Sequence, residues 1–122
     1  MSDWDNFTDD ELNCSCCGEP NPNLEFIELM DKVQEIRDEL GFPLPITSGY
    51  RCPDHPIECK KDKFGHHTVA AVDINVHHEQ AVELLKAATA KGFTGIGISQ
   101  TGAYKKRFIH LDLREDPTVW SY

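Results

Sequence analysis

The chain has 122 residues and is acidic, because 12 lysines and arginines stand against 21 aspartates and glutamates, which gives a formal net charge of −9. This charge argues against binding to a nucleic-acid backbone or an anionic membrane, since either partner favours a basic patch. A chain of this length buries about two-thirds of its unfolded surface, so we expect one domain over residues 1–122 that is a monomer and binds neither nucleic acid nor membrane.

The first segment, MSDWDNFTDDELN, is acidic and has neither the basic start nor the apolar stretch of a secretory signal peptide. No apolar run along the sequence is long enough to span a membrane. We therefore expect synthesis in the cytoplasm without a signal peptide, so that a target outside the cell is reached only after release or delivery.

Five cysteines are many for a cytosolic chain of this length. Those near the N-terminus could join one further along in a structural zinc site, or in a disulfide that tethers the N-terminal arm. The spacing does not match a Cys-x-x-Cys knuckle, so free, partly buried thiols are an equal alternative, and an odd count leaves at least one cysteine unpaired. The five are Cys14, Cys16, Cys17, Cys52 and Cys59.

Apolar residues recur every three to four positions after Asn23, which predicts a helix over residues 24–40 with Asn23 as its N-cap and Gly41 as its stop. The apolar stripe of this helix is expected to lie in the core. Prolines at positions 43 and 45 then favour an extended chain that enters a strand around residues 45–50. The stripe consists of Leu24, Ile27, Met30, Val33, Ile36 and Leu40.

A second strand is predicted over residues 69–76, where β-branched and small residues precede and follow Asp73. We consider whether Asp73 and a histidine seven positions before it could bind the same metal ion. On a helix these two residues would lie about 10 Å apart, which is too far for one ion whose bonds to its ligands are near 2 Å. The histidine must instead lie in a loop that folds back over the strand. Spacing alone does not choose between His66 and His67.

A second helix is predicted over residues 78–91, with buried Ala81, Leu84, Leu85 and Ala88 and an end at Gly92. Strands follow around residues 95–99 and 107–113, so the sequence predicts an α+β fold with a small antiparallel sheet and two main helices. In the last strand, alternation divides the side chains between two faces. Phe108, His110 and Asp112 share one face, and Ile109, Leu111 and Leu113 share the other.

A His/Asp/His set, made of one of the two adjacent histidines with Asp73 and His110, differs from the thiolate-rich ligand sets of structural zinc. Three protein ligands leave a fourth position for water, whose pKa a catalytic zinc lowers to about 7. Hydrolysis is the natural use of such a site. Taken alone, a His-x-Asp pair on a strand is more often a hydrogen-bonded surface pair.

Four motifs in order across nearly the whole chain give a more specific indication. They are ITSGYR at residues 46–51, GFTGIG at 92–97, FIHLDLR at 108–114 and the aromatic tail WSY at 120–122. Together with the segment around Asp73, they resemble the zinc D-alanyl-D-alanine carboxypeptidase and L-alanyl-D-glutamate peptidase family, whose fold is shared with the hedgehog signalling domain. Members of this family occur among phage and bacterial cell-wall enzymes.

The resemblance implies a ligand set and a substrate. The family has a histidine seven positions before its Asp-Ile pair, and this register implies that His66, with Asp73 and His110, binds zinc. It also implies a peptidoglycan peptide as substrate, with Ser48 and Arg51 in its binding site. The guanidinium fork of Arg51 suits a substrate carboxylate or a developing oxyanion, although an arginine in a surface ion pair is the alternative if the motif is taken alone.

The general base is harder to assign. Relatives carry an acid three residues before the last histidine ligand, or a histidine two residues before it, but here these positions hold Arg107 and Phe108, which cannot accept a proton. Asp112 is our candidate because it is the nearest acidic residue in sequence to His110 and shares its strand face. The alternative is that Asp112 only orients the ring of His110.

The sequence therefore predicts a single zinc peptidase domain that hydrolyses peptidoglycan stem peptides next to a D-amino acid, as a carboxypeptidase or an endopeptidase, in the manner of a phage endolysin. It would act on the cell wall after release or delivery. Two other classes stay open, namely a non-hydrolytic zinc-containing module that binds the cell wall and a structural component of a virion.

Overall fold

A computed structural model describes residues 4–14, 17–51 and 70–122 of the chain. Several predictions fall outside these residues. They concern the zinc ligand His66, its alternative His67, and three cysteines, Cys16, Cys52 and Cys59.

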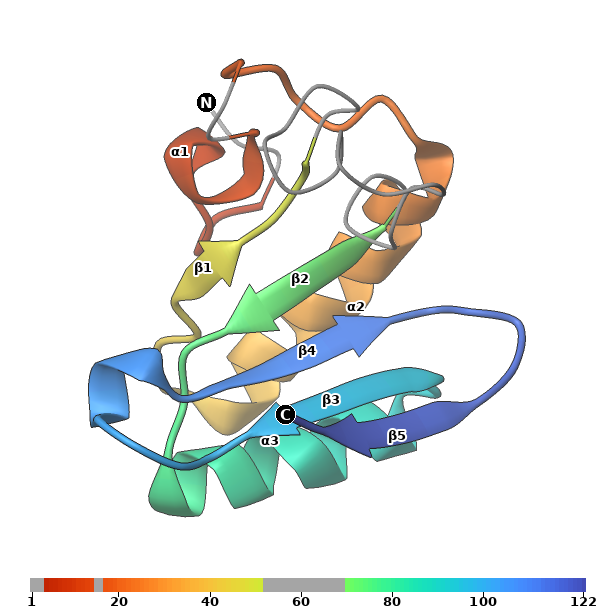
Figure 1. Cartoon of the computed structure of the whole chain (residues 1–122). Coiled ribbons are helices and arrows are strands. Elements are labelled where there is room, and N and C mark those ends of the chain that lie inside the picture. Colours follow the sequence, from red (N-terminus) through yellow and green to blue (C-terminus); the bar gives the residue numbers. More distant parts are fainter. Residues whose placement is uncertain (1–3, 15–16, 52–69) are drawn as a thin grey trace.

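The described residues form one five-stranded sheet with the two long helices packed against one of its faces (Figure 1). The helices are α1 (Asp9–Leu12), α2 (Leu24–Leu40), α3 (His78–Ala90) and the short 3-10 helix η3 (Tyr104–Lys106). The strands are β1 (Ile46–Ser48), β2 (Ala71–Ile74), β3 (Gly95–Ser99), β4 (Phe108–Asp112) and β5 (Thr118–Ser121).

The strand order is β1-β2-β4-β3-β5, and every neighbouring pair is antiparallel except β3 and β5, which run parallel. The predicted α+β class, with a small antiparallel sheet and two main helices, is confirmed. The four predicted strands are all present, with β1 and β2 shorter than expected. The fifth strand was not predicted, although its aromatic residues were noted as a motif.

The core face of α2 differs from the predicted stripe at the start of the helix. Leu24 is 78% exposed and Ile27 is 48% exposed, so these two predictions were wrong. Phe26 and Leu29 are buried in their place, because they continue the buried face one turn before Met30 and Val33, and Phe26 also packs edge-to-face against Trp4 at 6.1 Å between ring centroids. The prediction holds for Met30, Val33 and Ile36, and Leu40 packs at the margin of the core.

The second predicted helix is present as α3. Ala81, Leu84 and Ala88 are buried as predicted, and Leu85 packs partly against the core. Gly92 follows the helix with a positive φ of 84°, a conformation that glycine adopts without strain. Gly41 ends α2 in the same left-handed conformation, and its N–H donates to the carbonyl of Arg37.

The two faces of β4 divide as alternation predicted. Ile109 and Leu111 belong to the core cluster under the helices, whereas His110 and Asp112 contact each other on the opposite face. No helix in the described part of the chain is long and apolar enough to cross a membrane. The helix-free face of the sheet therefore carries the polar residues from which a site can be built.

Candidate functional site

The strand register brings five predicted or noted residues into one row across the sheet. Ser48 of β1 is paired with Asp73 of β2, which is paired with His110 of β4. His110 is paired on its other side with Gly97 of β3, which is paired with Trp120 of β5. Residues opposite one another on neighbouring strands project to the same face, so this row lies across the helix-free face.

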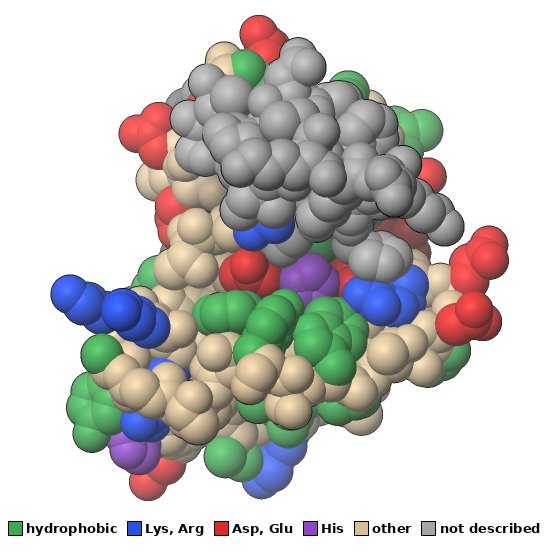
Figure 2. Space-filling view, viewed as in Figure 1, with side chains coloured by type: hydrophobic (Ala, Val, Ile, Leu, Met, Phe, Trp, Pro, Cys, Tyr) green, Lys and Arg blue, Asp and Glu red, His purple; other side chains and the backbone are tan. Residues whose placement is uncertain are grey.

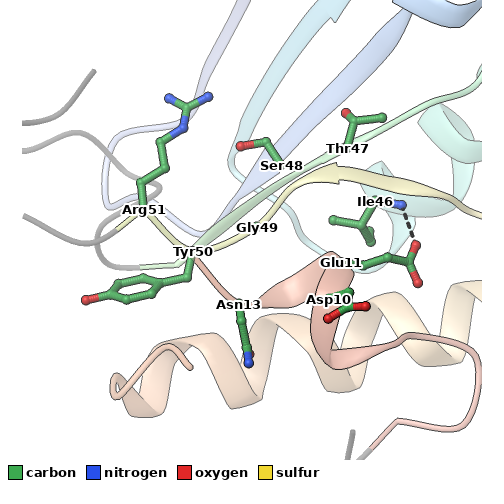
Figure 3. Close-up of a pocket in the computed structure, with 9 residues that line it drawn as sticks. All are labelled: Asp10, Glu11, Asn13, Ile46, Thr47, Ser48, Gly49, Tyr50 and Arg51. Atoms are coloured by element: carbon green, nitrogen blue, oxygen red, sulfur yellow. Dashed lines mark hydrogen bonds between the residues drawn. The ribbon is translucent and has the colours of Figure 1, made fainter. Parts of the chain in front are cut away.

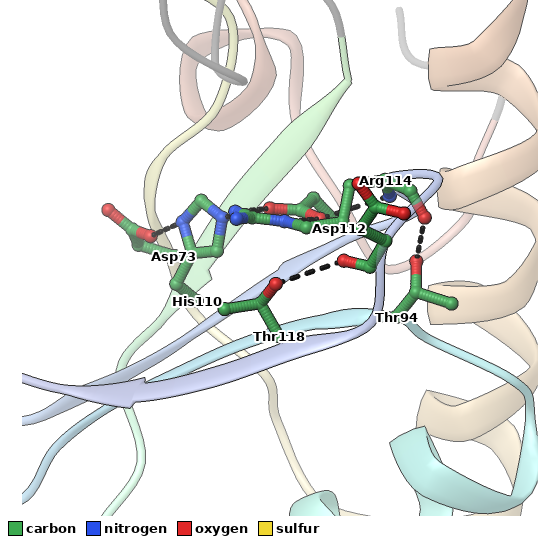
Figure 4. Close-up of polar contacts among 7 residues, drawn as sticks. Asp73, Thr94, His110, Asp112, Arg114 and Thr118 are labelled. Atoms are coloured by element: carbon green, nitrogen blue, oxygen red, sulfur yellow. Dashed lines mark hydrogen bonds and ion pairs between the residues drawn. The ribbon is translucent and has the colours of Figure 1, made fainter.

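Asp73 and His110 are 37 residues apart in sequence and meet directly in this row (Figure 4). The Oδ1 atom of Asp73 lies 2.9 Å from Nδ1 of His110, and both residues are buried. A carboxylate and an imidazole are both donors that zinc accepts. Two of the three predicted ligands are thus side by side, and their chemistry fits the metal that was predicted.

The other nitrogen of the same ring contacts Asp112. Oδ2 of Asp112 lies 2.7 Å from Nε2 of His110, so the ring is held between two carboxylates. An Nε2–H group that donates to Asp112 leaves Nδ1 on the Asp73 side with its lone pair for a metal ion. Burial lowers the pKa of His110, but the hydrogen bonds and charges of Asp112 and Asp73 outweigh it and raise this pKa above its usual value.

Asp112 is fully buried and is also bound by Arg114. The guanidinium donates from Nε to Oδ1 at 2.9 Å and from Nη2 to Oδ2 at 2.6 Å, and the backbone N–H of Arg114 donates to Oδ1 at 3.2 Å. Burial alone would raise the pKa of Asp112, but the hydrogen bonds from Arg114 and His110 hold it well below its usual value. The carboxylate is therefore charged and weakly basic.

These contacts bear on the choice between the two roles considered for Asp112. Both carboxylate oxygens are engaged, and a strongly lowered pKa makes a poor proton acceptor. The assignment of Asp112 as general base stays a prediction, and the contacts favour the alternative in which Asp112 orients His110. Arg114 was quoted in a motif but was not assigned a role from the sequence.

Aromatic side chains flank the buried histidine. The Trp120 ring lies 5.1 Å from the His110 ring between centroids, and Phe108 and Tyr122 meet at 5.0 Å. Figure 2 shows hydrophobic side chains gathered beside a histidine that lies between acidic and basic residues. Burial is the main cause that raises the pKa of the Tyr122 phenol above its usual value.

In the SGYR segment, Gly49 and Tyr50 contact the rest of the fold, whereas Ser48 and Arg51 line a pocket. A Cβ on Gly49 would lie 2.7 Å from the backbone oxygen of Leu12, so only glycine lets α1 pack this closely over β1. The Tyr50 N–H donates to the same carbonyl at 2.9 Å, and the Tyr50 side chain is buried with Cys14. The Glu11 carboxylate also accepts from the N–H of Ile46 at 2.9 Å, so α1 fixes the edge of the sheet.

Ser48 and Arg51 line a small pocket at this edge (Figure 3). Asp10 and Glu11 of α1 contribute acidic groups to the same pocket. The Arg51 side chain extends from the end of the SGYR segment to the side opposite the Tyr50 ring.

The third predicted ligand, His66, lies outside the described residues. Within the part that is described, no group of three or more histidines, cysteines and acids is arranged to hold a metal ion. Cys14 is buried and Cys17 is exposed, and the choice among the three alternatives for the cysteines stays a prediction.

A comparison with protein families identifies the chain. The model of the family described as peptidase M15 matches residues 5–112, which include Arg51, Asp73 and His110. The chain belongs to the peptidase M15 family. This is the zinc D-alanyl-D-alanine carboxypeptidase family that the motifs resemble, so the chain carries a peptidase domain of a generally zinc-dependent family. No curated protein matches the chain significantly.

The predicted ligand set can be tested by single alanine variants. His66→Ala, Asp73→Ala and His110→Ala should each lose bound zinc, because a site with three protein ligands binds weakly when one is removed. His67→Ala is the matched control and should retain most of the metal. Zinc content after dialysis would be measured by atomic emission, and a site emptied by His67→Ala but not by His66→Ala would shift the register by one residue.

The role of Asp112 can be tested with Asp112→Asn. If Asp112 orients His110, zinc affinity should fall by about 10–100-fold and turnover should recover at saturating zinc. Asp116→Asn removes the same charge at an exposed position and serves as the control. Turnover that falls by about 10²–10⁴-fold at full zinc occupancy would instead support Asp112 as the general base.

Proposed function

We propose that this M15 domain is a zinc-dependent peptidase that hydrolyses peptidoglycan stem peptides next to a D-amino acid, as a carboxypeptidase or an endopeptidase. The observation that carries the proposal is the buried pair of Asp73 and His110, whose ring is oriented by Asp112. A buried aspartate and histidine are costly unless each is paired, and buried titratable pairs with shifted pKa values are concentrated at functional sites.

His66, Asp73 and His110 would hold the zinc ion. Zinc bound there would supply a Lewis acid that polarises the scissile carbonyl and makes water acidic enough to react near neutral pH. Asp112 keeps the His110 ring in one orientation through Nε2, which leaves Nδ1 directed towards Asp73. The protein thus contributes a fixed ring and a buried carboxylate before any substrate binds.

Arg51 is proposed to bind the substrate. The residue is half-buried at the end of the SGYR segment, where Ser48 and the acids of α1 line the same pocket. A planar fork of N–H donors fits either the terminal carboxylate of a stem peptide or the oxyanion that develops at its scissile carbonyl. The first use suits a carboxypeptidase, and the second suits both kinds of peptidase.

A non-hydrolytic module that binds the cell wall is a second candidate, favoured by one observation. The positions at which relatives carry a base hold Arg107 and Phe108, and both oxygens of Asp112 are already engaged. Such a module would keep the zinc and the substrate site without efficient proton transfer.

We further propose that the protein meets peptidoglycan only after release or delivery from the cytoplasm, in the manner of a phage endolysin. The family membership supports a peptidase, and the cell-wall setting follows from the motifs. The route of delivery is a property of the producing cell or phage.

The experiment that tests the function is turnover of purified peptidoglycan. The zinc-loaded protein should release products with new amino and carboxyl termini, and a chelator should abolish this release because zinc activates the attacking water. Mass spectrometry of the products would identify the bond that is cut. Binding to peptidoglycan without release of products, with zinc present, would contradict the peptidase proposal and support the binding module.

The proposed role of Arg51 predicts a separation between activity and stability. Arg51→Lys keeps the positive charge but loses the planar fork, so kcat/KM on a peptidoglycan peptide should fall by at least about tenfold while the melting temperature stays nearly constant. Lys105→Arg makes the reverse exchange at an exposed position and is the control. Equal losses in melting temperature and rate would show that Arg51 serves the fold.

A further inference from the structure

Four side chains form a closed circuit of contacts around the proposed ligand His110. Asp112 accepts from His110 Nε2 and from the guanidinium of Arg114. The Arg114 guanidinium in turn lies 4.4 Å from the centre of the Trp120 ring. The centroids of the Trp120 and His110 rings are 5.1 Å apart, which closes the circuit. Cation–π and ring–ring contacts of this kind are directional, so each member restrains the next.

The circuit depends on two positions that lack a side chain. A Cβ on Gly97 would lie 2.6–2.7 Å from atoms of the Trp120 indole, a distance that real Cβ atoms essentially never show. A Cβ on Gly95 would overlap the Asp112 carboxylate. The two glycines of β3 therefore leave room for Trp120 to reach His110 from β5 and for Asp112 to lie over the sheet.

The circuit is separate from the hydrophobic core. It occupies the helix-free face, and Trp120 is partly exposed on an edge strand. The next residue, Val119, is 67% exposed and projects to the other face of the same strand. Substitution of Trp120 therefore removes few core contacts, so an effect on His110 can be separated from an effect on folding.

We propose that Trp120 and Arg114 are positioning residues of this peptidase, which hold the His110 ring with Nδ1 towards Asp73, and that Gly97 is required because it admits the Trp120 ring. Arg114 acts through Asp112, and Trp120 acts on the ring itself and on the guanidinium. This inference rests on the proposed function, since His110 must be a zinc ligand for its orientation to affect catalysis. It extends the site to β5, beyond the last residue of the family match at 112.

The first test measures zinc affinity by competition with a chromogenic chelator. Trp120→Leu and Arg114→Gln should each weaken zinc binding by about 10–100-fold, the usual effect of removing an outer partner of a ligating histidine. Trp120→Phe and Arg114→Lys should lie between these variants and the wild type, because a ring or a charge is retained. Val119→Ala is the control, and variants that bind zinc as tightly as this control would overturn the proposal.

The second test observes the ring directly in the metal-free protein. The wild type should show one sharp set of His110 ring signals in the nuclear magnetic resonance spectrum, with nuclear Overhauser contacts to the Trp120 indole. Trp120→Leu and Arg114→Gln should broaden or double these signals through exchange between ring orientations. A single unchanged set in both variants would overturn the proposal even if their melting temperatures fall.

A double-mutant cycle tests the part assigned to Gly97. Gly97→Ala should weaken zinc binding in the wild-type background, where the new methyl group displaces the indole. The same substitution should have little further effect in the Trp120→Ala background, because the space is then vacant. Equal losses in both backgrounds would show that Gly97 acts independently of Trp120 and would overturn its assigned role.

Failure of the proposed function would look different. A wild-type protein that binds zinc but releases no products from peptidoglycan would refute the proposed peptidase function. The zinc affinities, the ring signals and the double-mutant cycle would still decide whether Trp120, Arg114 and Gly97 position His110. A variant that keeps wild-type zinc affinity and ring signals would refute the inference while peptidoglycan turnover by the wild type would be unaffected.

Discussion

The constraint on which this structure depends is a buried histidine between two buried carboxylates. Charges removed from water are costly unless each finds a partner, and here Asp73 and Asp112 hold the two nitrogens of His110 while Arg114 neutralises Asp112 from the other side. The carboxylates, the ring and the guanidinium therefore stabilise one another as a unit. Such an arrangement persists when its cost is offset by a function, and membership of a metallopeptidase family supplies one.

The sheet is built to accommodate this unit. Antiparallel pairing of β2 and β4 places Asp73 opposite His110. Gly95 and Gly97 of β3 have no side chains, which leaves space over this strand for the side chains of Asp112 and Trp120. Strand β5 pairs in parallel with β3 and places Trp120 beside the His110 ring. At the opposite edge, α1 packs on β1 through Gly49, and Ser48 and Arg51 of the SGYR segment line a pocket beside it.

The electrostatics of the site separate two tasks that a carboxylate can perform beside a metal. Asp73 presents its carboxylate to the same space as His110 Nδ1, as a ligand must. Asp112 has its oxygens engaged and its pKa held low, which suits a group that orients an imidazole and does not suit a group that exchanges protons. Asp112 thus owes its low basicity to the guanidinium of Arg114 and to the ring of His110.

The sequence by itself determined the α+β class, the two long helices and the face of β4 on which His110 and Asp112 lie, because these depend on local periodicity and alternation. It misjudged Leu24 and Ile27, since two overlapping apolar stripes were possible and only tertiary packing, which includes the contact of Phe26 with Trp4, selected Phe26 and Leu29. The contact of Arg114 with Asp112 joins residues two positions apart and was not predicted although it is local. Tertiary structure alone decided that Trp120 contacts the His110 ring and the Arg114 guanidinium. These contacts arise between strands whose order and direction are set by global packing, which no local pattern in the chain encodes.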